Sequence, residues 1–199
     1  MKIIGITGPT GAGKSLLSEY FRKNGIPVID ADKVYHSLLV PPSECLDALR
    51  NAFGNGIFQE DELDRRALSE IVFHDEEKLA LLNHTVLDFV LDECRKTFAD
   101  LEKEGHAVSA VDAPTLIESG FWRECDRVIS VLSDSDIRVE RIMARDGLTK
   151  EAAATRVRGQ KDDSFYIEKS DTVLMNDRDE AAFLRKCDEL VKKLKGDRS

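Results

Sequence analysis

The feature that most constrains the fold is a glycine-rich run near the start of the chain, Gly8-Pro9-Thr10-Gly11-Ala12-Gly13-Lys14-Ser15. Its spacing fits the phosphate-binding P-loop, G-x-x-x-x-G-K-[ST]. A buried β-branched strand is predicted before it, at Lys2–Ile6, and a helix with an apolar stripe after it, at Ser15–Asn24. A strand, a glycine loop and a helix in this order direct backbone N–H groups and the positive helix end toward phosphate oxygens. The sequence therefore predicts a nucleotide site rather than a chance glycine-rich turn.

The chemistry of such a loop gives roles to its residues. Lys14 is expected to reach the β- and γ-phosphates, and the Ser15 hydroxyl is expected to bind Mg²⁺, the cofactor that we predict. The glycines let the backbone curl tightly around the phosphates. The nucleotide-binding residues predicted in this segment are Gly8, Gly11, Ala12, Gly13, Lys14, Ser15 and Leu16.

Composition argues against several classes of partner. With 29 basic and 38 acidic side chains the net charge is −9, which disfavours DNA or RNA as the main partner because that binding needs clustered cations. No stretch of the sequence approaches the roughly 20 apolar residues of a membrane span. The four cysteines show no C-x-x-C spacing, and the P-loop starts too near the first residue for a signal peptide. We therefore expect free thiols and a cytoplasmic protein.

Apolar strands alternate with helical segments along the chain, which predicts an α/β fold with a doubly wound, five-stranded parallel sheet of the P-loop NTPase type. The remaining four strands are expected at Ile26–Ile29, Ala107–Val111, Arg127–Leu132 and Thr172–Met175. Ligands of such sheets bind beyond the carboxyl ends of the strands. This rule selects the P-loop, the pair Asp30 and Asp32, and Asp112 as parts of one site.

A long helical stretch separates the second and third strands, and no strand is expected from Ser43 to Glu104. Its last helix is predicted to bury one apolar stripe, formed by Leu79, Leu82, Val86, Phe89, Val90 and Phe98. At 199 residues we expect a single domain. Its parts are a core of residues 1–40, 105–135 and 165–199, a helical insertion at 41–104 and a helical lid at 136–164.

Carboxylates at two strand ends are candidates for catalysis and metal binding. A carboxylate after the second strand can accept a hydrogen bond from an acceptor hydroxyl and take its proton late in phosphoryl transfer. Spacing favours Asp32 over Asp30, and the alternative is that one or both only cap the next helix. Asp112 stands where a Walker B carboxylate holds Mg²⁺, and the alternative is a turn carboxylate before Pro114.

Three arginines follow the fourth strand at helical spacing, Arg138, Arg141 and Arg145. Many small kinases carry a mobile lid at this point, and arginine binds phosphate oxygens bidentately. A row of charges is also typical of a solvated helix face. The pattern leaves both interpretations open.

Several segments together resemble the dephospho-coenzyme A kinase family. They are Ile4–Ser15, Val28–Asp32 (VIDAD), Leu63–Phe73, Leu82-Asn83, Val111–Gly120 (VDAPTLIESG), Arg141–Leu148 (RIMARDGL), Arg156–Gln160 (RVRGQ), and Lys169 to Asp171 with Asn176. The P-loop occurs in many families, whereas the pairing of VIDAD with D-x-P-x-x-x-E-x-G and R-x-x-x-R-D-G-L is much more specific. The resemblance runs from residue 3 to about residue 176.

The resemblance implies ATP as donor and the ribose 3′-hydroxyl of dephospho-coenzyme A as acceptor, the last step of coenzyme A biosynthesis. It implies that Asp32 is the base and that Arg141 and Arg145 lie in a lid that closes over the phosphates, with Arg141 catalytic and Arg145 nucleotide-binding. It assigns the helical insertion to the pantetheine arm and adenosine of the acceptor, and it places Asp32 and Glu118 on the acceptor side.

Three places depart from the family pattern, and one of them is Phe165-Tyr166, in a stretch that usually has fewer aromatic residues. Leu87-Asp88 stand where the family often has His-Pro, and Thr115 stands where a second leucine is common after Pro114. The alternative from another functional class is a P-loop switch or regulatory ATPase. A GTP switch should carry an N-K-x-D guanine motif, which this sequence lacks.

Overall fold

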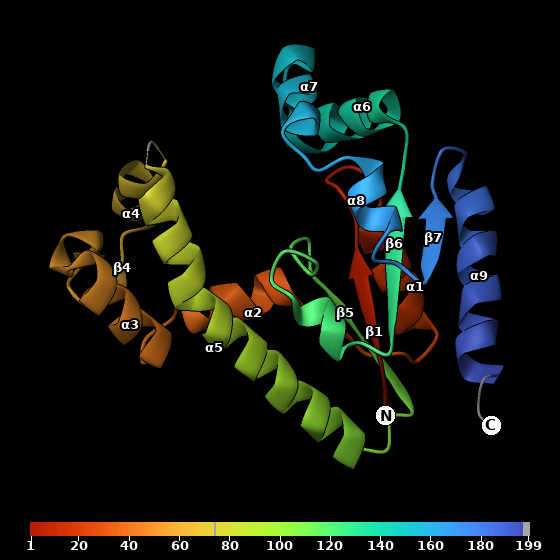
Figure 1. Cartoon of the computed structure of the whole chain (residues 1–199), viewed down its shortest axis with the longest axis horizontal. Helices are drawn as coiled ribbons and strands as arrows, with labels where there is room; N and C mark the ends of the chain where they lie inside the picture. Colours follow the sequence, from red (N-terminus) through yellow and green to blue (C-terminus); the bar gives the residue numbers. More distant parts are fainter. Residues whose placement is uncertain (74, 197–199) are drawn as a thin grey trace. The chain divides into compact units, whose positions relative to one another are not determined.

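A five-stranded parallel sheet carries the P-loop, as the sequence predicts (Figure 1). The computed structural model describes residues 1–73 and 75–196. It divides into a sheet unit, Met1–Ile29 with Leu101–Ser199, and a helical unit, Asp30–Asp100. The strands are β1 (Lys2–Thr7), β2 (Val28–Asp30), β5 (Val108–Asp112), β6 (Arg127–Leu132) and β7 (Thr172–Met175). Their order in the sheet is β2-β5-β1-β6-β7.

Strand β1 lies in the middle of the sheet and pairs in parallel with β5 and β6. Its apolar run is continuous because both faces of a central parallel strand are covered. In the two registers Ile6 lies opposite Asp112 and Thr7 lies opposite Ser130. The P-loop therefore leaves the sheet between the carboxyl ends of β5 and β6.

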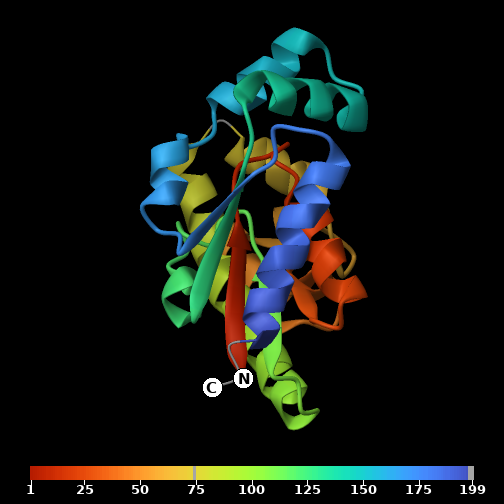
Figure 2. The ribbon, with the colours of Figure 1, turned by 90° about the vertical axis from the view of Figure 1, so that its right-hand side faces the viewer.

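Helices α1 (Lys14–Lys23) and α9 (Glu180–Gly196) cover one face of the sheet (Figure 2). Their apolar stripes bury Leu17 and Phe21 of α1 and Phe183 of α9 against Ile4 and Ile6. The other face carries η2 (Phe121–Glu124) and α8 (Asp163–Ile167), in a second cluster built on Ile117, Leu132 and Tyr166. The five-residue helix α8 was not expected, because it is too short to show helical periodicity.

Helices α6 (Ser135–Asp146) and α7 (Lys150–Arg158) stand beyond the carboxyl ends of the strands (Figure 1). The side chains of Asp134 and Thr149 cap their first turns, and Gly147 ends α6 in a left-handed conformation. The two helices share a small core of their own, centred on Val139 and Ile142. The segment that follows β6 therefore packs as a helical hairpin.

The helical unit contains α2 (Ala31–Leu38), α3 (Glu44–Phe53), η1 (Asn55–Ile57), α4 (Arg65–Val72) and most of α5 (Glu76–Lys103). The expectation that 43–104 holds no strand is wrong, because β3 (Phe58–Gln59) and β4 (Glu62–Leu63) form a short antiparallel hairpin. Glu60 turns it with a φ of 56°. Strands of two residues are too short to leave an alternating pattern in the sequence.

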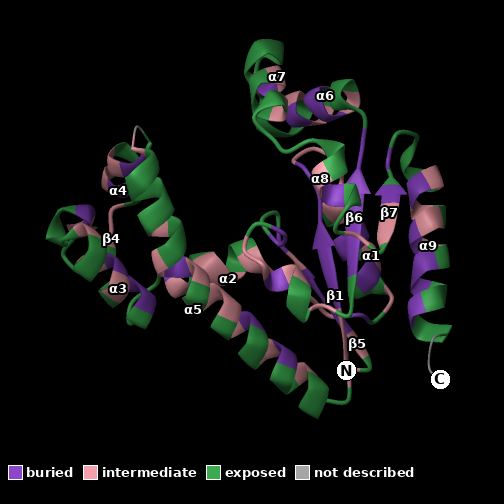
Figure 3. Cartoon of the chain, viewed as in Figure 1, coloured by how far each residue is buried: buried purple, intermediate pink, exposed green. Residues whose placement is uncertain are grey.

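The core of the helical unit is formed by α3, η1, α4 and α5, around Leu46, Leu49, Ile57 and Leu68. The predicted stripe of α5 is only partly correct, since Leu79 is 44% exposed while Val86 is buried. Along α5 as a whole, exposed residues lie beside buried and intermediate ones (Figure 3). Helical spacing places these residues on one face, but burial also requires a packing partner, and the cluster on α5 begins at Leu82. Within the described residues, none of the helices has the length and apolar character of a membrane span.

Candidate functional site

The P-loop joins β1 to α1 in a backbone shape that three glycines permit. Gly8, Gly11 and Gly13 have φ values of 135°, 79° and 101°, a region that other residues rarely adopt. A Cβ on Gly8 would lie 2.2 Å from the carbonyl oxygen of Val131 in β6. A Cβ on Gly13 would lie 2.3 Å from Nδ2 of Asn176, just after β7. The loop is thus packed directly against the ends of two strands.

Lys14 and Ser15, the two side chains with predicted phosphate and metal roles, lie in the first turn of α1. Lys14 Nζ donates to the carbonyl oxygens of Gly8 at 2.7 Å and Pro9 at 3.3 Å, so its charge stays within the loop. Gly13 is the N-cap and brings no side chain to accept from the first turn. The first-turn N–H groups, the helix dipole and the lysine together make this end of α1 suited to an anion.

Asp112 ends β5 and faces α1. Ser18 Oγ donates to Asp112 Oδ2 at 2.6 Å, and Ser18 follows Ser15 by three residues, on the same helix face. A hydroxyl and a carboxylate are the hard oxygen ligands that Mg²⁺ prefers, so this donor set fits the ion. Across residues 1–73 and 75–196 no group of three or more His, Cys, Asp or Glu side chains could hold a metal ion. The sequence reasoning missed Ser18, although its spacing from Ser15 was visible.

The two aspartates after β2 have different local roles. Asp30 is the N-cap of α2, with Oδ1 accepting from the Lys33 N–H at 3.1 Å and Oδ2 at 3.5 Å from Lys33 Nζ. Asp32 lies in the first turn of α2 with an exposed side chain. The capping interpretation therefore holds for Asp30, and Asp32 is the carboxylate of the pair that does not serve as the cap.

The predicted lid arginines separate into distinct environments. Arg141 reaches the P-loop, 3.4 Å from the carbonyl oxygens of Gly11 and Ala12, and also donates to the Asn176 carbonyl at 2.9 Å. Arg138 is only 5% exposed, so a solvated helix face is the wrong interpretation for it. The P-loop lies against Arg138 at Thr10 and Gly11, on a helix face that the charge pattern alone marks as polar.

Arg145 pairs with its own neighbour instead of the P-loop. Its Nε and Nη2 donate to the two carboxylate oxygens of Asp146 at 2.7 and 2.9 Å, and Arg156 of α7 donates to the same carboxylate at 2.5 Å. The hydrogen bonds from Arg145, followed by the charge of Arg156, hold the pKa of Asp146 below its ordinary value. This triad ties α6 to α7.

Asn176 was noted only as part of a motif, yet it is central to the loop. It is 4% exposed, and its Nδ2 donates to the Ala12 carbonyl at 2.8 Å. The rule that sites form at the carboxyl ends of strands could have identified it, because Asn176 follows β7 directly. Glu118 is exposed in the loop after β5, and burial and then the Glu118 charge raise the pKa of Tyr166 to about 12.

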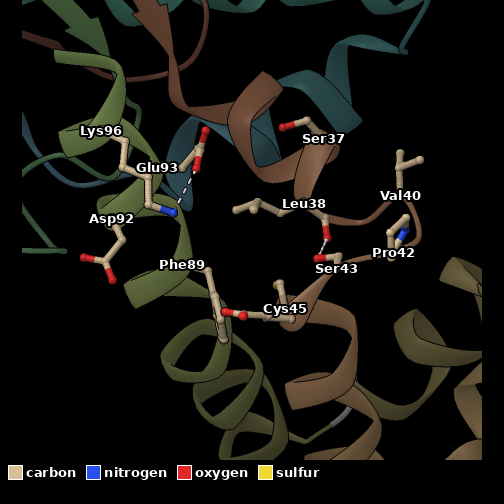
Figure 4. Close-up of a pocket in the computed structure, with 11 residues that line it drawn as sticks. Ser37, Leu38, Val40, Pro42, Ser43, Cys45, Phe89, Asp92, Glu93 and Lys96 are labelled. Carbon is tan, nitrogen blue, oxygen red and sulfur yellow. Dashed lines mark hydrogen bonds and ion pairs between the residues drawn. The ribbon is translucent and has the colours of Figure 1, made fainter. Parts of the chain in front are cut away.

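The helical unit has a cavity of its own, with a volume of about 320 Å³ (Figure 4). Apolar side chains of Leu38, Cys45 and Phe89 line its middle, and Asp92, Glu93 and Lys96 of α5 line one side. Lys96 Nζ lies 3.5 Å from a Glu93 carboxylate oxygen, and Ser43 Oγ donates to the Leu38 carbonyl. The lining of the cavity is therefore mixed, with apolar side chains beside the charged side chains of α5.

The P-loop follows the central strand of a parallel sheet, and a helical hairpin that carries arginines follows β6. This combination defines a P-loop kinase, an enzyme that transfers a phosphoryl group. A family model described as dephospho-CoA kinase matches residues 2–181. The chain belongs to the dephospho-CoA kinase family, whose members phosphorylate dephospho-CoA with ATP in the last step of coenzyme A biosynthesis.

Individual proteins agree with this assignment. The chain is 35% identical over 176 residues to the dephospho-CoA kinase of Bacillus anthracis, covering 88% of each chain. The dephospho-CoA kinase structure from Campylobacter jejuni matches with a TM-score of 0.72 and 28% identity, over 98% of this chain and 99% of that one. The Thermus thermophilus protein TT1252 matches with a TM-score of 0.79 and 29% identity, over 97% of both chains.

Proposed function

We propose that Asp32 accepts the proton of the ribose 3′-hydroxyl of dephospho-CoA while Lys14, Arg141 and the P-loop amides stabilise the phosphoryl group of ATP. The kinase activity follows from the family, and the roles of the residues are the proposal. One observation carries it, namely that two cations from different helices contact the same loop. Lys14 of α1 binds its first carbonyls and Arg141 of α6 lies against later ones.

The reaction requires one bond to form and one to break. The 3′-oxygen attacks the γ-phosphorus in line, the bond from that phosphorus to the β–γ bridging oxygen breaks, and ADP leaves. The hydroxyl proton passes to the Asp32 carboxylate, which is exposed at the start of α2. Negative charge grows on the bridging oxygen, where the fixed charges of Lys14 and Arg141 stabilise it most.

Ser15 and Asp112 would hold Mg²⁺, since the Ser18 hydrogen bond keeps the Asp112 carboxylate against the helix face that carries Ser15. Held there, Mg²⁺ would supply positive charge that neutralises part of the charge of the nucleotide phosphates. Leu16 and the loop residues before it supply backbone N–H groups to the same phosphates.

We assign the acceptor to the helical insertion, residues 41–104, within a chain whose core is 1–40, 105–135 and 165–199. The cavity of Figure 4 supports this, because its mixed lining of apolar, hydroxyl and charged side chains suits an acceptor with an extended, partly polar arm. Glu118 would lie on the acceptor side. Residues 136–164 would act as the lid, with Arg145 exchanging Asp146 for phosphate oxygens on closure.

The place of action that we propose is the cytoplasm. The four cysteines are free, as is typical of proteins in a reducing compartment. The net charge of −9 further supports small anionic substrates held by a few local cations rather than a nucleic acid.

The proposal is tested by measuring ADP release from MgATP with and without dephospho-CoA, with adenosine and shikimate as control acceptors. Release should depend on dephospho-CoA, and the product mass should rise by one phosphoryl group. Release that is slow and indifferent to every acceptor would instead favour a regulatory ATPase.

The base is tested with a matched pair of variants. Asp32→Asn should lower kcat by about 10²- to 10⁴-fold and leave the KM for ATP within about twofold. Asp30→Asn removes a charge two residues away, but asparagine caps helices as well as aspartate, so its kcat should stay near that of the parent protein. Normal turnover in Asp32→Asn would remove Asp32 from the mechanism.

A further inference from the structure

Thr10, the third residue of the P-loop, is held on both sides by side chains from the helices after β6. Arg138 Nε of α6 donates to the Thr10 carbonyl at 2.9 Å. Gln160, which follows α7, accepts from the Thr10 N–H at 3.1 Å. The loop also lies directly on α6, since a Cβ on Gly11 would be 2.9 Å from the Arg138 carbonyl oxygen. The tip of the loop is therefore anchored to the lid segment.

The buried guanidinium of Arg138 lowers the stability of the folded protein. Arg138 is 5% exposed, and in the part of the chain that the structure describes its Nη2 has no hydrogen-bond partner. Burial lowers the pKa of Arg138, and the charge of Asp163 only partly offsets this. A buried N–H group without a partner loses its hydrogen bonds to water and is destabilising. Because a neutral side chain of similar length would avoid this cost, stability alone does not explain an arginine here.

Because the peptide bond is planar, a contact that holds a carbonyl group also fixes the direction of the next N–H group. In a trans peptide the C=O and the next N–H point in opposite directions. The Thr10 carbonyl is held by Arg138, and the Ala12 carbonyl is held by Asn176 Nδ2. The N–H groups of the following residues, Gly11 and Gly13, are therefore turned away from these anchors.

We propose that Arg138 is a positioning residue for ATP, which holds the Thr10 carbonyl outward so that the Gly11 N–H points at the terminal phosphates. The inference rests on the proposed role of the P-loop as the ATP site. Arg138 does not touch the substrate. Its guanidinium acts through the loop backbone, and its positive charge lies behind the anion site.

Three substitutions separate the hydrogen bond from the charge. Arg138→Met removes both and keeps most of the volume, Arg138→Lys keeps a charged donor, and Arg138→Gln keeps a neutral donor. The control is Arg158→Met, at the exposed end of α7, where the guanidinium donates to Thr155 of the same helix. The dissociation constant for ATP is measured by titration without acceptor, and KM is then measured for each substrate.

Arg138→Met should raise both the dissociation constant and the KM for ATP about tenfold, or ~1.4 kcal/mol, while the KM for dephospho-CoA stays within about twofold. Arg138→Lys should restore ATP binding to within about threefold of the parent protein, with Arg138→Gln between the two. A purely structural role would change the melting temperature and both KM values together. That result, or unchanged ATP binding in folded Arg138→Met, would overturn the inference.

If Arg138→Met does not fold, the lysine and glutamine variants provide the test. Arg138→Lys should bind ATP more tightly than Arg138→Gln, because it keeps the positive charge as well as a donor. The titration needs no acceptor, so it is independent of the phosphoryl-transfer assay. Weakened ATP binding in Arg138→Met together with a parent protein that does not phosphorylate dephospho-CoA would remove only the proposed function. Normal ATP binding in the variant with intact phosphorylation would remove only the role of Arg138.

Discussion

The glycine at the start of the P-loop offers the sharpest test of how the site is built. Gly8 has a φ of 135°, and a Cβ added to it would lie 2.2 Å from the carbonyl oxygen of Val131. Gly25, after α1, also has a positive φ, of 72°, but a Cβ there would meet nothing within 4 Å. Gly8→Ala and Gly25→Ala therefore share backbone strain and differ in contact with the sheet.

The structure allows the two costs to be separated. At Gly25 alanine adds the strain of a left-handed conformation, which we put at about 1 kcal/mol once the lower entropy of the unfolded chain is included. At Gly8 strain of about 1–3 kcal/mol adds to about 1–3 kcal/mol for forcing an atom against strand backbone, or roughly 4 kcal/mol together. For a chain of this length we expect Gly25→Ala to melt about 2–4 °C lower and Gly8→Ala about 8–16 °C lower.

Thermal unfolding with and without ATP provides the assay. ATP at about 100 times its dissociation constant should stabilise the parent protein and Gly25→Ala alike, by about 2.7 kcal/mol. Gly8→Ala should gain only about 0.4 kcal/mol, the value expected when the displaced loop binds ATP about 100-fold more weakly. A Gly8→Ala protein with a melting temperature near that of Gly25→Ala and a full ATP-induced shift would refute the reasoning.

Three further outcomes follow from the site and its surroundings. Asp112→Ala should raise the Mg²⁺ concentration for half-maximal rate about tenfold in a titration at fixed ATP, and an unchanged requirement would exclude Asp112 as a ligand. Arg145 lowers the pKa of Asp146 from its ordinary value, so the stability that this carboxylate contributes is present above the ordinary pKa and is lost as pH falls through the lowered pKa. Asp146→Asn should thus have a lower urea midpoint than the parent at neutral pH, with the gap closing in acid, and a constant gap would contradict the pairing. Burial raises the pKa of Cys125 to about 12, so a thiol reagent at mildly alkaline pH should modify it only after unfolding, and rapid reaction in the folded protein would show that the thiol is accessible.

Much of the sheet unit could be predicted because its signals are local. The apolar runs that became β6 (Arg127–Leu132) and β7 (Thr172–Met175) were placed at their observed bounds. The P-loop spacing requires a strand before it and a helix after it, so the position of Lys14 at the start of α1 was also predictable. In each case the residues that decide the structure are neighbours in the chain.

The rest depended on contacts between distant residues. The hydrogen bond from Ser18 to Asp112 joins residues 94 positions apart, and the one from Asn176 to Ala12 joins residues 164 positions apart. The burial of Arg138 is likewise not visible in any local pattern of the sequence. The exposure of Leu79 is the opposite case, since it has the helical spacing of the stripe but is not among the α5 residues of the buried cluster, which are Leu82, Val86 and Phe89. Local periodicity selects which face of an element is apolar, but only the packing of whole elements decides which polar groups are desolvated and must find partners. The sequence by itself thus determined that this chain binds phosphates and transfers a phosphoryl group, and the tertiary structure decided which side chains hold the phosphate loop in shape.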